Sequence, residues 1–112
     1  CALPIWLMME IKSIEEQGRI ILEVSGRIDT TTAGSFEKQV LPYLQSGSEL
    51  VLDCDQVEYI SSAGLRSLLI LAKVASARDS RIVLCRLSGL VREVLEISGF
   101  DSFFEVRHER NG

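Results

Sequence analysis

Short apolar runs that alternate with helical patterns constrain the fold of this chain more than any other feature. Three runs read as strands because they are short and rich in aliphatic, often β-branched residues: Arg19–Val24, Leu50–Leu52 and Arg81–Cys85. A helical pattern follows each of them. Strands that are joined by helices pair in parallel through right-handed crossovers, and the helices then layer against the sheet. We therefore predict an α/β fold built on a layered sheet.

Turn and helix-end signals supply the remaining elements. Met9–Ile14 alternates weakly, and a turn at 15–18 separates it from the strand at Arg19, which predicts a hairpin. The threonine run 30–32 suits the entry of the first helix, and Pro42 either kinks its last turn or marks a change to irregular structure. The other expected elements are a polar connection at Asp53–Glu58, helices over Ala63–Arg78 and Ser88–Ser98 (the latter stopped by Gly99), and a last strand over Phe103–Val106. The predicted order is β-β-α-β-α-β-α-β.

Length and composition exclude several classes of function. The 112 residues make one domain, and the net charge of −4 argues against direct nucleic-acid binding. A single histidine, His108, gives no basis for histidine catalysis or a histidine-rich metal site. Cys1, Cys54 and Cys85 lack CxxC spacing, so we expect free thiols in a reducing, cytoplasmic compartment, with neither a disulfide framework nor a zinc site. We expect no cofactor and no membrane insertion, because the apolar runs fall short of the ~20 residues that a span needs.

The beginning of the chain is almost entirely apolar. Residues 2–9 read ALPIWLMM, which is too short for a membrane helix and lacks the basic leader of a signal peptide. Either Met8 or Met9 is the natural start, or this run opens the first strand. We therefore leave residues 1–8 unassigned, place one domain at 9–106 and expect a tail at 107–112.

The middle helix carries apolar residues on both of its faces. At 100° per residue, one face is expected to be buried against the sheet: Leu65, Leu68, Leu69, Ala72, Ala75 and Ser76. The opposite face is expected to be outward: Arg66, Ser67, Ile70, Val74, Ala77 and Arg78. Ile70 and Val74 stand one turn apart on this outward face. They are either scattered surface residues or a docking strip beside the helix start.

The start of this helix contains two adjacent serines. A serine hydroxyl is among the best N-caps, which explains one of the pair. The amides and positive dipole end of a helix start also suit an anion, so the other serine is a candidate for phosphorylation. Gly64 would allow the backbone of a partner to approach closely.

Three segments in order resemble the STAS domain family, the module of sulfate transporters and anti-sigma factor antagonists. The first is Gly26–Asp29, the second joins Leu50–Asp53 to Ile60–Leu69, and the third is Leu90–Asp101. The agreement covers about Met9 to Val106, nearly the whole chain. The resemblance implies a mixed β-sheet with parallel central strands and helices packed mainly on one face.

The resemblance also implies a function and a site. In bacterial anti-sigma factor antagonists, an anti-sigma factor serine kinase phosphorylates the serine that falls on Ser62 here. The unphosphorylated form binds the anti-sigma factor, and a serine phosphatase restores it. The expected partner-binding residues are Asp29, Thr30, Thr31, Ser61, Ala63, Gly64, Arg66, Ile70 and Val74. Ser61 stands where the family usually has Asp, which removes a carboxylate and makes Ser61 an alternative phosphoacceptor.

The sequence leaves two hypotheses for the function. The first is an anti-sigma factor antagonist that serine phosphorylation switches. The alternative is a constitutive STAS scaffold, or an accessory subunit of a transport or signalling complex, without a phosphoswitch. An enzyme is the weakest reading, because Ser62 has no histidine or lysine placed as a base and Lys73 lies about three helical turns away.

Overall fold

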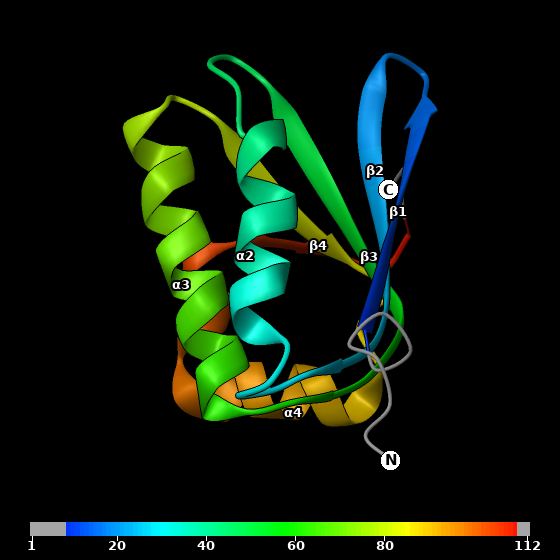
Figure 1. Ribbon diagram of the computed structural model, residues 1–112, viewed down its shortest axis with the longest axis vertical. Coiled ribbons are helices and arrows are strands. Elements are labelled where there is room, and N and C mark those ends of the chain that lie inside the picture. The colour runs from blue at the N-terminus through cyan, green and yellow to red at the C-terminus, as the bar shows by residue number, and fades with distance from the viewer. Residues whose placement is uncertain (1–8, 110–112) are drawn as a thin grey trace.

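The computed structural model describes residues 9–109 (Figure 1). Its elements in chain order are β1 (Met9–Glu16), β2 (Arg19–Ile28), α2 (Ala33–Val40), the 3-10 helix η1 (Leu41–Tyr43), β3 (Glu49–Ile60), α3 (Ser62–Ala77), β4 (Arg81–Cys85), α4 (Gly89–Ser98), the 3-10 helix η2 (Phe100–Phe103) and β5 (Glu105–Arg107). The predicted order of strands and α-helices is therefore confirmed. The unassigned segment 1–8 lies outside the described residues.

The strands form one mixed sheet in the order β1-β2-β3-β4-β5. β1 and β2 pair antiparallel as the predicted hairpin, and the turn is Gln17-Gly18, where both residues have positive φ. The other three pairings are parallel. The parallel central strands expected from the helix–strand alternation are thus confirmed.

The helices gather on one side of the sheet. Figure 1 shows α2 and α3 side by side over one face, with α4 lying across one end. The main core fills the space between them, and its largest fully buried side chains include Phe36, Leu52, Leu71 and Leu95. The helix-free face carries a second, small apolar cluster of Ile21, Val51, Val83 and Cys85.

Several boundaries differ from the prediction. β1 and β2 each extend further than expected, to Glu16 and Ile28. β3 does not end at Leu52: residues 53–58, expected to form a polar connection, belong to a strand of 12 residues. The polar residues are accommodated because β2 continues beside this segment through two register shifts, and because Arg86 pairs with Asp53 and Asp55 at 3.5 and 2.7 Å.

The segments near Pro42 and after Gly99 also differ from simple expectation. Pro42 lies in η1, which directly continues α2, so the chain tightens there before it becomes irregular. Gly99 ends α4 in a left-handed conformation, as predicted. The predicted last strand over 103–106 is present but shifted: Phe103 ends η2, and β5 begins at Glu105 and ends at Arg107, inside the predicted tail.

The buried face of α3 is rotated from the predicted one. Leu68 and Ala75 are buried as expected, but Ser76 is exposed, and Leu71, which was on neither predicted face, is fully buried. Ser67 was predicted to face outward and is only 2% exposed. The reason is that α2 packs beside α3, so that α3 buries one flank on the sheet and another on its neighbour helix.

Candidate functional site

The loop between β2 and α2 is held by its own side chains. The Asp29 carboxylate accepts hydrogen bonds from the backbone N–H groups of Thr31 and Thr32, at 3.0 and 3.3 Å. The buried Thr32 hydroxyl accepts from the N–H of Asp29 and donates to the carbonyl of Arg27. Thr30 and Thr31 are left exposed at the tip. The predicted docking residue Asp29 therefore shapes the loop that presents these two threonines.

The two serines at the start of α3 have different environments. Ser61 is the N-cap: its hydroxyl accepts from the N–H of Gly64 at 3.3 Å, and its own N–H donates to the carbonyl of Ile28 at 2.9 Å. Ser62 is the first helical residue and is exposed. The expectation that capping explains one of the two serines is confirmed, and the capping serine is Ser61.

Gly64 is required by the chain's own packing. A Cβ atom at this position would lie 2.5 Å from the carbonyl oxygen of Ile28 and 2.7 Å from the side chain of Ile60. The close backbone approach that we expected from a partner is thus made by β2 of the same chain, and Gly64 is buried. Its contribution is to let the start of α3 sit directly against the end of β2.

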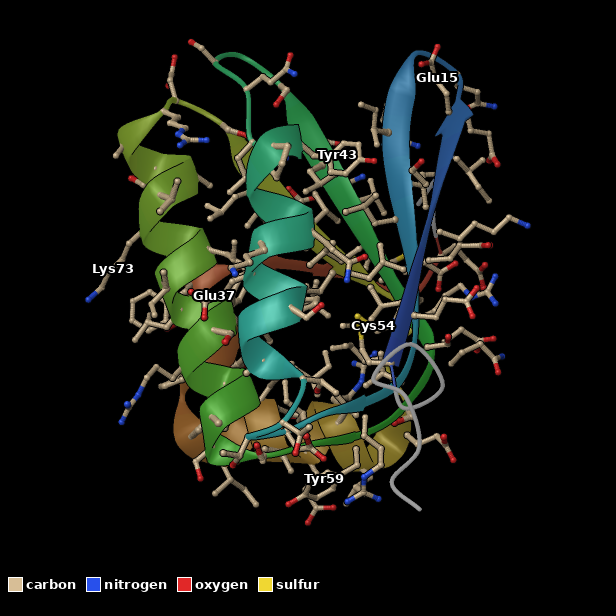
Figure 2. The ribbon with its side chains drawn as sticks, viewed as in Figure 1. Glu15, Glu37, Tyr43, Cys54, Tyr59 and Lys73 are labelled. Carbon is tan, nitrogen blue, oxygen red and sulfur yellow. The ribbon has the colours of Figure 1, made fainter. Side chains whose placement is uncertain are left out.

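A cavity of about 340 Å³ opens between the starts of α2 and α3. We call it the α2–α3 cavity, and its lining residues are Thr30, Ala33, Glu37, Ser62, Ala63, Arg66 and Ser67. The Ser67 hydroxyl bridges the two helices, since it lies 2.9 Å from the Glu37 carboxylate and 3.3 Å from the carbonyl of Ala33. Figure 2 shows Glu37 on α2 directed toward α3. Within the described part of the chain, the cavity is therefore lined by one carboxylate, that of Glu37, which Ser67 fixes in place, and by one guanidinium, that of Arg66.

An aromatic ring and two charged side chains lie close to the loop between β2 and α2. The Arg27 guanidinium sits 4.7 Å from the ring centre of Tyr59, and its Nε lies 3.6 Å from the Asp29 carboxylate. Tyr59 is 38% exposed and lies at the same end of the molecule as α4 (Figure 2). These contacts connect the end of β3 to the β2–α2 loop and give the loop a rigid support.

The displaced pKa values belong to groups outside the cavity. Burial raises the pKa of the Cys54 thiol. A hydrogen bond from Arg86 lowers the pKa of Asp55, and one from Arg107 lowers the pKa of Glu105.

Within residues 9–109, no three His, Cys, Asp or Glu side chains are arranged to hold a metal ion. In the same part of the chain, no helix is both long enough and apolar enough to span a membrane.

Sequence comparisons place the chain in a known family. The family model of the STAS domain matches residues 11–111. BtrV of Bordetella bronchiseptica, named as an anti-sigma factor antagonist, is 37% identical over 103 residues, which span 91% of this chain and 89% of BtrV. The chain belongs to the STAS domain family. The anti-sigma-B factor antagonist of Listeria monocytogenes is 30% identical to this STAS domain over 110 residues, covering 95% and 96% of the two chains.

Solved structures share the fold of this STAS domain. An anti-sigma factor antagonist from Thermotoga maritima superposes with a TM-score of 0.79 at 19% identity, covering 90% of this chain and 88% of that one. The Bacillus cell fate determinant SpoIIAA, solved in its phosphorylated form, gives a TM-score of 0.65 at 14% identity over 92% and 94% of the chains. The predicted family and the fold that it implies are both confirmed.

Four of the residues predicted to form the site meet at the α2–α3 cavity: Thr30, Ser62, Ala63 and Arg66. Ile70 is 39% exposed further along α3, whereas Val74 is half-buried and packs against the core. The predicted outward strip is therefore exposed at Arg66 and Ile70 and turns inward at Val74. Sequence reasoning missed Glu37 and placed Ser67 on the wrong face, because only the packing of α2 on α3 brings these two side chains together.

Proposed function

We propose that this STAS domain is a non-enzymatic anti-sigma factor antagonist of the cytoplasm, switched by phosphorylation of Ser62. One observation carries the proposal. Of the two adjacent serines, Ser62 is exposed on the rim of the α2–α3 cavity, whereas Ser61 is engaged as the N-cap of α3. The relatives that are named as antagonists, and match nearly the full chain, support the same function.

The surface around Ser62 suits a docked protein. The exposed Thr30 of the β2–α2 loop lines the same cavity as Ser62, and Arg66 and Ile70 follow Ser62 along α3. The unphosphorylated surface combines hydroxyl, guanidinium and aliphatic groups, which fit a polar and apolar protein interface. We assign the docking surface for an anti-sigma factor to this set of residues.

Phosphate at Ser62 would act electrostatically on that surface. It adds about −1.5 to −2 charges at neutral pH. A partner that packs closely would have to desolvate this charge or face it with a like charge, and either effect costs several kcal/mol. A loss of only ~1.4 kcal/mol already weakens binding about tenfold. A single phosphate therefore suffices to release the partner, and a serine phosphatase would restore binding.

Phosphate mapping tests the proposal. The purified protein is incubated with magnesium ATP and the anti-sigma factor kinase of the same organism, and phosphate is located by mass spectrometry. Wild type and Ser61→Ala should carry the label on Ser62, and Ser62→Ala should carry none. Wild type without label on either serine would contradict the phosphoswitch, and label confined to Ser61 would contradict the assignment to Ser62.

A second candidate function is a constitutive scaffold. Ser61 favours it, because this serine stands in the position where the family usually has Asp. Ser62→Asp separates the two. A switched antagonist should lose about tenfold or more in affinity for the anti-sigma factor, measured by calorimetry. Affinity unchanged from wild type, with Ser62→Asn as the uncharged control, would favour the scaffold.

A further inference from the structure

Arg66 lies beside the proposed phosphorylation site and has no ion-pair partner among the residues that the structure describes. The arginines within residues 9–109 are mostly engaged: Arg19, Arg27, Arg81, Arg86 and Arg107 form ion pairs, and Arg78 donates to two backbone carbonyls. Arg66 takes part in no salt bridge in this part of the chain, although it is exposed and lines the α2–α3 cavity. Its guanidinium is therefore available to an anion at this place.

The spacing of Arg66 and Ser62 on α3 brings the two side chains together. Residues four apart on a helix are neighbours, with Cβ atoms about 5–6 Å apart. An anion that precedes a cation by four residues has the favourable orientation for such a pair. Ser62 and Arg66 also line the same cavity.

The other charges near Ser62 work against a phosphate. Glu37 faces the same cavity from α2, and the Ser67 hydroxyl fixes it in place at 2.9 Å. Asp29, in the β2–α2 loop, is already paired with Arg27. Among the described residues, Arg66 is thus the one basic side chain that lines the cavity, and it is the group that can offset the repulsion from Glu37.

Resting on the proposed function, we propose that Arg66 captures the phosphate of Ser62 within the same chain. The switch then has two parts. Phosphorylation adds negative charge to the docking surface, and it also withdraws a guanidinium that the unphosphorylated chain offers to a carboxylate of the anti-sigma factor. Charge-assisted pairs between arginine and phosphate are stronger than neutral hydrogen bonds, and the planar guanidinium can donate two of them at once.

Phosphorus NMR tests this capture without the kinase. Phosphoserine is introduced at position 62 during translation, and the second ionisation of the phosphate is titrated. A neighbouring guanidinium favours the dianion, so Arg66→Ala should raise the second pKa by about 0.3 of a unit or more. Arg66→Lys should keep part of the effect, since it retains a charge but loses the planar fork. Glu37→Gln should lower the pKa, because it removes the repelling carboxylate.

Lys73→Ala is the matched control for a lost positive charge on the same helix. Lys73 projects from α3 on the side away from α2 (Figure 2), whereas the cavity lies between these two helices, so its removal should leave the phosphate pKa where it was. The capture is overturned if Arg66→Ala leaves this pKa unchanged, or if Lys73→Ala shifts it equally. Circular dichroism of each variant checks that the fold is retained.

A binding experiment tests the second part of the inference. For wild type and for Arg66→Ala, we compare the affinities of the unphosphorylated protein and of the phosphoserine-62 protein for the anti-sigma factor. The factor by which phosphorylation weakens binding should be about two- to fivefold smaller in Arg66→Ala than in wild type, because the variant has no guanidinium to withdraw. An equal ratio would contradict the withdrawal. If phosphorylation does not weaken binding in wild type, the proposed function fails, while the NMR result still decides whether Arg66 captures the phosphate.

Discussion

At the scale of single residues, one backbone hydrogen bond gives the adjacent Ser61 and Ser62 different roles. The sequence indicates that a serine caps this helix but not which of the two. The choice depends on the end of β2, because the N–H of Ser61 donates to the carbonyl of Ile28 and thereby fixes where the first turn of α3 begins. The cap position then leaves Ser62 exposed as the first helical residue.

Ser61→Ala should therefore destabilise the protein, whereas Ser62→Ala should not. Loss of an N-cap hydroxyl costs about 1 kcal/mol of unfolding free energy. Ser62 is exposed, and its replacement should change this free energy by no more than about 0.5 kcal/mol. Urea unfolding of the two variants measures both values. Equal losses in the two variants would show that both hydroxyls contribute to the cap.

Gly64 and Gly34 make a matched pair of helical glycines. A Cβ at Gly64 would meet the backbone oxygen of Ile28 at 2.5 Å, and backbone cannot rotate away as a side chain can. Gly64→Ala should therefore cost about 1–3 kcal/mol of unfolding free energy. A Cβ at Gly34 in α2 meets nothing within 4 Å, so Gly34→Ala should be neutral or stabilising by up to about 1 kcal/mol. Thermal unfolding measures both, and a Gly64→Ala protein as stable as wild type would refute the packing argument.

At the scale of elements, charged side chains join four strands on the helix-free face. Glu49 of β3 pairs with Arg19 of β2 at 3.1 Å and with Arg81 of β4 at 3.3 Å. Glu105 of β5 pairs in turn with Arg81 and Arg107. The short last strand is thereby attached to the sheet by more than the backbone pairing of its three residues.

Acid should weaken this attachment of β5. The hydrogen bond from Arg107 lowers the pKa of Glu105 in the folded protein below the usual value of a glutamate. A carboxyl with a depressed folded pKa stabilises the fold fully above the unfolded pKa and loses this contribution as pH falls through the folded pKa. Glu105→Gln should therefore lower the urea midpoint at pH 7, and the gap from wild type should close as pH falls below about 4.5.

Glu93→Gln provides the control for this pH dependence. Glu93 is exposed on α4 and takes part in no ion pair within residues 9–109. Its replacement should leave the urea midpoint close to that of wild type at pH 7. If the difference in urea midpoint between Glu105→Gln and wild type persists unchanged at pH 3, the ion-pair origin of the effect is contradicted.

The elements also show what the sequence could and could not predict. Leu50–Leu52, Arg81–Cys85 and the helix that Gly99 ends have strong local patterns, and their types were predicted correctly. The predicted strand ends before β3 does, because Asp53 and Asp55 are residues typical of a loop. Their ion pairs with Arg86 explain how a strand accommodates them. The bridge between Glu37 and Ser67 has no local signal either, since it joins residues 30 apart. Local elements follow from local patterns, whereas the lining of the cavity follows from how α2 and α3 pack.

At the scale of the whole molecule, one sheet separates two apolar clusters of unequal size. Cys54 belongs to the large cluster under the helices, and Cys85 belongs to the small cluster on the helix-free face. Within residues 9–109 neither thiol takes part in a disulfide, and both are buried and carried by adjacent paired strands. They therefore report separately on the two faces of the same sheet.

We expect both thiols to become reactive only through global unfolding. Burial raises the pKa of Cys54, so the folded protein holds almost no thiolate there at pH 8. Because the clusters share strands β2, β3 and β4, neither face should open while the sheet persists. In a Cys1→Ser background, labelling by a maleimide in increasing urea, resolved by peptide mass spectrometry, should give one opening free energy for both cysteines. Labelling of Cys85 well before Cys54 would instead show that the helix-free face opens on its own, since it has fewer apolar partners and no helix to cover it.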